Sequence, residues 1–224
     1  MKKIFTFSLV IFAIIFASAQ TYTELNKFAN WGISLSGNLN FKDDSKPDRL
    51  SIKNTKSFSV GGFYEFYAQN HWSFIVGLDF NYYDIFDFEN NANKSFSENS
   101  HCFSVPLLLQ YKTRMANKTF LSAKAGLYVD LNRDDNGAIG YNNTGIGGTL
   151  VKVNYQADYL NYSFLFGLGA MFDLNYFLLG TDVVFSYYPG SSKTTITYTE
   201  GYSDKFSMNG NYLGIKLSFR PKKF

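Results

Sequence analysis

Eight charged side chains stand at isolated positions within stretches whose other residues are mostly apolar or small. Four are acidic and four are basic: Glu65, Asp79, Asp130 and Asp182 against Lys112, Lys124, Lys216 and Arg220. Charges removed from water must be paired, so equal numbers of each sign favour a network of internal ion pairs. The functional alternative is a narrow polar pore or a proton path. A pore selective for ions of one sign should show an excess of one charge, and these two sets are equal.

Other residues with catalytic or metal-binding potential are few. His71 and His101 are the only histidines, and His71 falls in a tight turn without an obvious catalytic partner. A Ser-His-acid site around His101 would need a geometry that spacing alone does not supply. The run from Asn132 to Gly137 is similar to the start of a calcium loop, but Asn143 stands where the closing Glu should be. We therefore assign no catalytic, cofactor-binding or metal-binding residues.

The charged residues lie in segments that alternate with a period of two. In residues 72–82, one face carries Trp72, Phe74, Val76, Leu78, Phe80 and Tyr82, and the other face is mainly polar or small. Such alternation is typical of a strand with unlike faces. Eight segments follow this pattern, at residues 31–41, 58–68, 72–84, 102–113, 120–131, 159–172, 176–188 and 208–220.

The connections between these segments alternate between long and short. Polar stretches at residues 42–57, 85–100, 132–158 and 189–206 are predicted to be long loops, and tight turns join the other strands. Within the third stretch, Leu150–Tyr155 could extend a strand beyond the main sheet. An all-β, eight-stranded antiparallel up-and-down barrel explains this alternation, because all long loops then lie at one end. Transmembrane barrels of bacterial outer membranes have this asymmetry.

The apolar face is expected to point outward, towards lipid. An eight-stranded barrel holds a filled core or one small ligand, and the large side chains of this face would not fit inside it. The opposite face is rich in small residues, which suit a narrow lumen. Trp31 and Trp72 begin strands at the turn end, while Tyr82 and Tyr187 lie at the loop end, as expected for two interfacial belts. Pro106 is expected at a bulge or near the barrel's end.

The first residues indicate export. Lys2 and Lys3 precede an apolar run and then Ala17-Ser18-Ala19, which predicts a signal peptide over residues 1–19 and a barrel domain over residues 20–224. After cleavage, 19 basic and 18 acidic residues leave a net charge of +1, which argues against nucleic-acid binding. The lone Cys102 forms no internal disulfide.

Four stretches of the sequence resemble the PorT-like family of outer-membrane β-barrels. They are residues 61–66, 72–78 and 125–128 and, above all, Ser104-Val-Pro-Leu-Leu-Leu-Gln-Tyr-Lys112. The run from Tyr212 to Phe219 is similar to the closing-strand signal read by the barrel-assembly machinery, although it ends five residues before Phe224. The resemblance implies an outer-membrane location and no known catalytic set. Because some members of the family assist protein secretion and gliding, the resemblance also implies an accessory role of this kind.

We therefore expect a monomeric, non-enzymatic outer-membrane protein whose long outer loops make contacts or assist secretion. Its expected partners are outer-membrane lipid or lipopolysaccharide, the barrel-assembly machinery, and secretion-system or surface proteins. Three alternatives stay open: a small passive channel, a lipid-modifying enzyme and, last, a soluble carrier of the lipocalin type.

Overall fold

The computed structural model describes residues 25–41, 50–52, 54–67, 71–90, 95–132, 137–141, 151–156, 160–190, 192–198, 203–208 and 210–223. The predicted signal peptide lies outside the described residues. The same holds for most of the calcium-like sequence, at residues 133–136 and 142–143.

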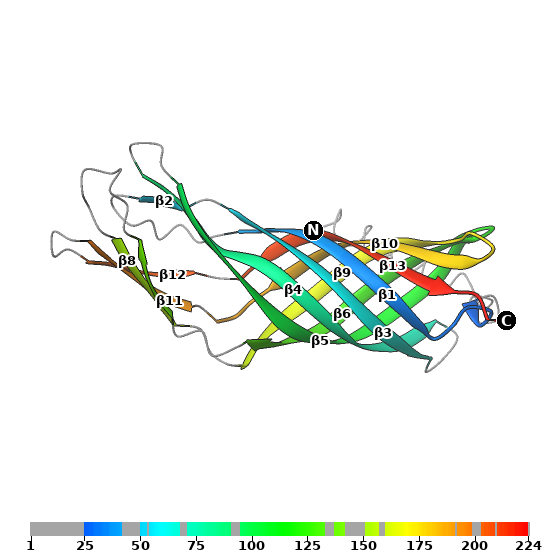
Figure 1. Cartoon of the computed structure of the whole chain (residues 1–224). Coiled ribbons are helices and arrows are strands. Elements are labelled where there is room, and N and C mark those ends of the chain that lie inside the picture. Colours follow the sequence, from blue (N-terminus) through cyan, green and yellow to red (C-terminus); the bar gives the residue numbers. More distant parts are fainter. Residues whose placement is uncertain are drawn as a thin grey trace, which may run out of the picture.

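Eight antiparallel strands close into a barrel, as predicted (Figure 1). Each strand pairs with the next one along the chain, and the last strand pairs with the first. Closure satisfies the backbone groups that an open sheet edge would leave unpaired in lipid. The barrel strands are β1 (Trp31–Asn40), β3 (Thr55–Tyr67), β4 (Trp72–Asn90), β5 (Ser95–Ala116), β6 (Thr119–Asn132), β9 (Leu160–Asp173), β10 (Phe177–Tyr187) and β13 (Tyr212–Pro221).

The segments expected to be loops contain further strands. The strand suggested at Leu150–Tyr155 is present as β8 (Val151–Gln156), whereas the other strands described in these segments were not predicted. β4 and β5 stay paired through residues 86–89 and 95–98, and β2 (Leu50–Ile52) pairs with the far end of β4. A separate sheet has the order β12-β11-β8-β7. Its strands are β7 (Gly137–Tyr141), β8 (Val151–Gln156), β11 (Ser192–Tyr198) and β12 (Ser203–Met208). This outer sheet lies beyond the loop end of the barrel (Figure 1).

Side chains alternate between the outside and the inside of the barrel along each strand. In β10, Val183 is 55% exposed, whereas its neighbour Val184 is 2% exposed. The exposed set on the outer face includes Ile33, Leu35, Phe74, Leu78, Phe166 and Leu168. The large apolar side chains therefore face outward, as expected from their volume. The described part of the chain contains no helix long and apolar enough to cross a membrane.

Two tight turns at the other end use residues in the left-handed backbone region. Asn117 and Lys118 join β5 to β6, and the φ of Lys118 is 64°. Between β9 and β10, Asn175 has a φ of 71°, and its backbone N–H donates to the Asp173 carboxylate at 2.9 Å. An Asn side chain tolerates this region better than most, and the Asp173 bond closes the turn.

Pro106 lies at neither a bulge nor a barrel end, so that expectation is wrong. The pairing of β4 with β5 keeps one register from Val76↔Leu107 to Asp79↔Ser104, with no pairs recorded at Gly77 and Leu78 between them. The Pro106 side chain is buried on the inside of the barrel. A Cβ on Gly77 would come within 3.0 Å of the Pro106 Cγ atom. The absence of a side chain at Gly77 thus makes room for the proline ring in mid-strand.

Candidate functional site: the barrel interior

The first ionic cluster lies inside the barrel towards its turn end. Glu65 of β3 accepts hydrogen bonds from Lys112 of β5 and Arg220 of β13. All three side chains are at most 4% exposed. Ser73 also donates to Glu65, and Arg220 donates through Nη2 to the Tyr67 hydroxyl at 2.6 Å. One carboxylate therefore holds two cations and links three strands that are not neighbours in the sheet.

A second pair joins Lys124 of β6 to Asp182 of β10. Their nitrogen and oxygen atoms are 2.6 Å apart, and the two side chains are 10% and 1% exposed. The Ser122 hydroxyl donates to the other Asp182 oxygen at 3.0 Å. Because β9 lies between β6 and β10, this pair also crosses a strand.

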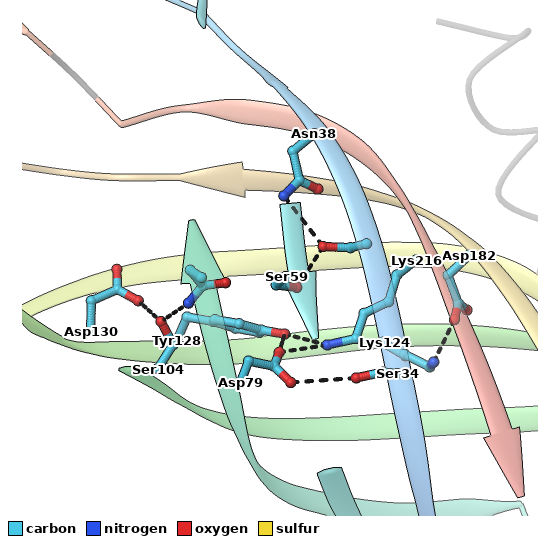
Figure 2. Close-up of polar contacts among 12 residues, drawn as sticks. Ser34, Asn38, Ser59, Asp79, Ser104, Lys124, Tyr128, Asp130, Asp182 and Lys216 are labelled. Carbon is cyan, nitrogen blue, oxygen red and sulfur yellow. Dashed lines mark hydrogen bonds and ion pairs between the residues drawn. The ribbon is translucent and has the colours of Figure 1, made fainter. Parts of the chain in front are cut away.

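The third cluster centres on Asp79 of β4. Lys216 donates to Asp79 Oδ2 at 2.7 Å and to the Tyr128 hydroxyl at 2.6 Å, and that hydroxyl donates to the same carboxylate at 2.7 Å. Ser34 donates to the second Asp79 oxygen at 3.4 Å. Figure 2 shows Lys216 and Tyr128 converging on Asp79, with Lys124 reaching Asp182 beside them. Every oxygen of this buried carboxylate thus has a partner.

Asp130 stands apart from the other seven predicted residues. It accepts a hydrogen bond from Ser104, which in turn receives one from the Asn81 amide at 2.5 Å. Among the described residues, no ion pair to Asp130 is present, and Figure 2 shows it on the far side of Tyr128 from the lysines. The structure therefore brings seven of the eight charged residues into three ionic clusters and leaves Asp130 with neutral partners.

The interior also contains an apolar layer that was not expected from the sequence. Ile75, Leu108, Tyr128, Leu165 and Val184 form a buried cluster, and Phe63 and Tyr212 pack against it. Their side chains lie on the inward face of the strands, where the alternation predicts mainly polar or small residues. The signal that could have revealed them is the presence of Leu108, Leu165 and Val184 within strands that are apolar on both faces.

A short segment before β1 closes the turn end. Leu25 and Phe28 are fully buried and pack with Phe120, Met171 and Leu178. The Ala29 N–H donates to the Pro221 carbonyl at 2.7 Å, and Arg220 Nε donates to the Ala29 carbonyl at 2.9 Å. We name residues 25–29 the stopper. It connects the turn-end wall of the barrel to the first ionic cluster.

The cavity left between the ionic clusters is small. It has a volume of about 30 Å³ and is lined by Lys124, Asp182, Lys216 and Arg220 together with Leu165 and Val184. A polar cavity needs roughly 10–15 Å³ of such volume for one water molecule. The described interior thus has room here for one or two waters rather than for a solute.

The histidines lie at separate places. His71 Nδ1 is 2.9 Å from the Lys112 carbonyl at the turn end, and its ring stacks with Tyr111. His101 is exposed, with its ring 5.8 Å from that of Phe80 on the outer face. Within the described ranges, no group of three His, Cys, Asp or Glu side chains is placed to hold a metal ion.

A closed barrel with an apolar outer face and a filled polar interior defines the class of integral outer-membrane β-barrel proteins. The family model described as outer membrane protein beta-barrel domain matches residues 17–195. The chain belongs to this family, and its location is the bacterial outer membrane.

Two solved structures align with the chain at low sequence identity, and the similarity to the first of them supports the fold. The outer membrane protein OprG from Pseudomonas aeruginosa aligns with a TM-score of 0.58 and 14% identity, over 88% of this chain and 97% of OprG. The outer membrane protein AlkL aligns with a TM-score of 0.45 and 17% identity, over 92% of this chain and 95% of AlkL. No curated protein sequence matches the chain. These similarities concern the fold alone.

Proposed function

We propose that the protein is a monomeric, non-enzymatic outer-membrane barrel with a sealed interior, and that its outer sheet and extended β4–β5 hairpin make contacts outside the cell. One observation carries the proposal: ion pairs, an apolar layer and the stopper occupy the described interior, while five further strands and the extensions of β4 and β5 continue beyond the barrel. Structure that lies outside the membrane and is not needed for closure is available for binding.

A narrower version follows from the resemblance to PorT-like barrels. In this version, the contacts are with secretion-system or surface proteins, and the protein assists secretion or gliding. Lipopolysaccharide would surround the outer part of the barrel, and the barrel-assembly machinery would act on β13 during insertion. The similarity of Tyr212–Phe219 to the closing-strand signal supports this last contact.

Genetic complementation tests the proposal. A strain lacking the gene receives the full chain, a variant in which residues 137–156 and 192–208 are replaced by short turns, or the lumen variant Asp79→Asn/Lys216→Met. We expect the full chain and the lumen variant to restore the wild-type profile of surface and secreted proteins, and the variant without the outer sheet to fail. Membrane fractionation must first show equal amounts of inserted barrel.

The second candidate is a small passive channel, and the charged side chains of Lys124, Asp182 and Lys216 around the internal cavity favour it. The same experiment separates the two functions. If the lumen variant fails and the variant without the outer sheet succeeds, the interior performs the function. For the enzyme alternative, a change in the mass of lipid A between strains with and without the gene would contradict the non-enzymatic assignment.

A further inference from the structure

Basic side chains gather at the turn end of the barrel. They come from the stopper, the end of β5, the β5–β6 turn and the C-terminal residues: Lys27, Arg114, Lys118, Lys222 and Lys223. We name these five residues the basic rim. The nearest described carboxylate to the rim is Asp173, which is 6% exposed and pairs with the half-exposed Lys27 at 2.5 Å.

Backbone contacts hold the rim residues around the β9–β10 turn. The Asp173 N–H donates to the Lys118 carbonyl and the Lys222 N–H to the Tyr176 carbonyl, both at 2.8 Å. Lys118 Nζ donates to Asn175 Oδ1 at 2.7 Å, which keeps this ammonium beside the turn. The cations are therefore attached to a rigid frame, although Lys118, Lys222 and Lys223 are exposed.

The excess of positive charge is confined to this end. The segments on the other side, residues 42–57, 85–100, 132–158 and 189–206, contain ten basic and eleven acidic residues. Charges inside the barrel are distributed in the same direction, with more positive charge towards the turn end. Glu65 with its two cations lies towards that end, and Asp130, which has no cation beside it among the described residues, lies towards the loop end. A general need for solubility would not separate the charges in this way.

Aromatic side chains mark the depth at which the rim lies. Tyr176 is 83% exposed, and Trp31 and Trp72 are 56% and 40% exposed at the same end of the barrel. Exposed Tyr and Trp rings on a membrane barrel lie at the level of the lipid headgroups. The basic rim is at or just beyond that level, on the side of the short turns, which is the periplasmic side.

We propose that the basic rim binds the phosphate groups of anionic phospholipids in the periplasmic leaflet. Basic residues near an anionic membrane surface attract it over about a Debye length. The rim fits a headgroup layer better than a folded partner, because its cations come from separate turns and termini and surround no groove or pocket in the described structure. This inference does not depend on what the outer sheet binds.

Native mass spectrometry of the refolded mature chain in a neutral detergent tests the proposal. Phosphatidylglycerol and phosphatidylcholine with the same acyl chains are titrated in parallel. We expect the wild type to prefer phosphatidylglycerol, and each rim charge removed to weaken that preference by about fivefold at low salt. Lys118→Gln/Lys222→Gln/Lys223→Gln should therefore lose roughly 100-fold, and Lys222→Gln alone, which disturbs least, about fivefold.

The matched control is Lys56→Gln/Lys193→Gln/Lys205→Gln, which removes the same charge from β3, β11 and β12 near or beyond the loop end. It should keep the preference of the wild type. Equal affinity of the wild-type protein for the two lipids would overturn the proposal, and so would an equal loss in the control. Gel mobility before and after boiling checks that every variant contains a folded barrel.

Discussion

At the scale of single residues, Asp79 shows how a carboxylate is accommodated inside a barrel. It is 1% exposed and receives bonds from an ammonium and two hydroxyl groups on three other strands. A buried charge of this kind is stable only while its partners are present. The pair between Asp79 and Lys216 thus constrains the interior more than it adds to net stability.

Removal of one charge of the Asp79–Lys216 pair should therefore lower the free energy of unfolding more than removal of both charges. Lys216→Met leaves the Asp79 charge without a cation and should lower the free energy of unfolding in bilayers by about 3–5 kcal/mol. Asp79→Asn/Lys216→Met removes both charges and should recover most of that loss. Urea titration followed by Trp fluorescence measures both. A loss below about 1 kcal/mol in the single variant would show a solvated, weak pair.

The sequence was sufficient to place the eight charged residues on one face but not to pair them. Alternation fixes the face of each side chain, whereas partner choice depends on how far each strand is staggered against the next. Asp79 and Lys216 are 137 positions apart and on strands that are not adjacent. Nothing in the local pattern distinguishes Asp130, which has no ion pair among the described residues, from the paired carboxylates.

At the scale of elements, each barrel strand separates two environments. β10 offers a matched comparison, because Val183 faces outward and Val184 packs in the apolar layer. The neighbours are the same residue type at nearly the same depth. A slip of one residue in register would exchange their surroundings.

Replacement of Val by Phe should have unequal effects on the free energy of unfolding at the two positions. Val183→Phe adds apolar surface towards lipid and should change the free energy of unfolding by less than about 1 kcal/mol. Val184→Phe overfills the space beside Leu165 and Leu108 and should cost about 1–3 kcal/mol. Chemical unfolding in vesicles of one lipid composition compares the two. The reverse order would show that the facing of β10 is wrong.

The stopper is a second element with a defined energetic role. Phe28→Ala should lower the free energy of unfolding by about 3–5 kcal/mol, because it leaves a cavity beside Phe120 and Met171. Phe28→Leu refills most of that volume and should recover much of the loss. Limited proteolysis at the N-terminus gives an independent measurement. If Phe28→Ala leaves both stability and cleavage unchanged, the stopper does not seal the turn end.

The elements beyond the barrel show where sequence patterns fail. The barrel strands were predictable because lipid on one side and a narrow interior on the other impose strict alternation. Residues 95–100, Ser-Phe-Ser-Glu-Asn-Ser, continue β5 past the barrel with little apolar content. Strands outside the membrane need no apolar face towards lipid, so the signal that marks the barrel is absent there. The stopper escaped prediction because five residues are too few to show a period.

At the scale of the whole molecule, the interior is filled from the stopper at one end to Asp130 towards the other. Three ionic clusters, one apolar layer and a cavity for one or two waters occupy the described lumen. At the opposite end, the β4–β5 hairpin and the outer sheet extend beyond the barrel (Figure 1). The central claim to be tested is the proposal that the barrel seals the membrane and that the protein acts through the strands outside it.

Single-channel recording in planar bilayers tests this claim most directly. The purified mature chain is reconstituted at neutral pH, with a general porin as the positive control. The account predicts no stable current steps from the wild-type protein, since paired charges, packed apolar side chains and the stopper occupy the described interior. Large, long-lived steps that scale with the amount of folded protein would show that the charged residues line an open pore.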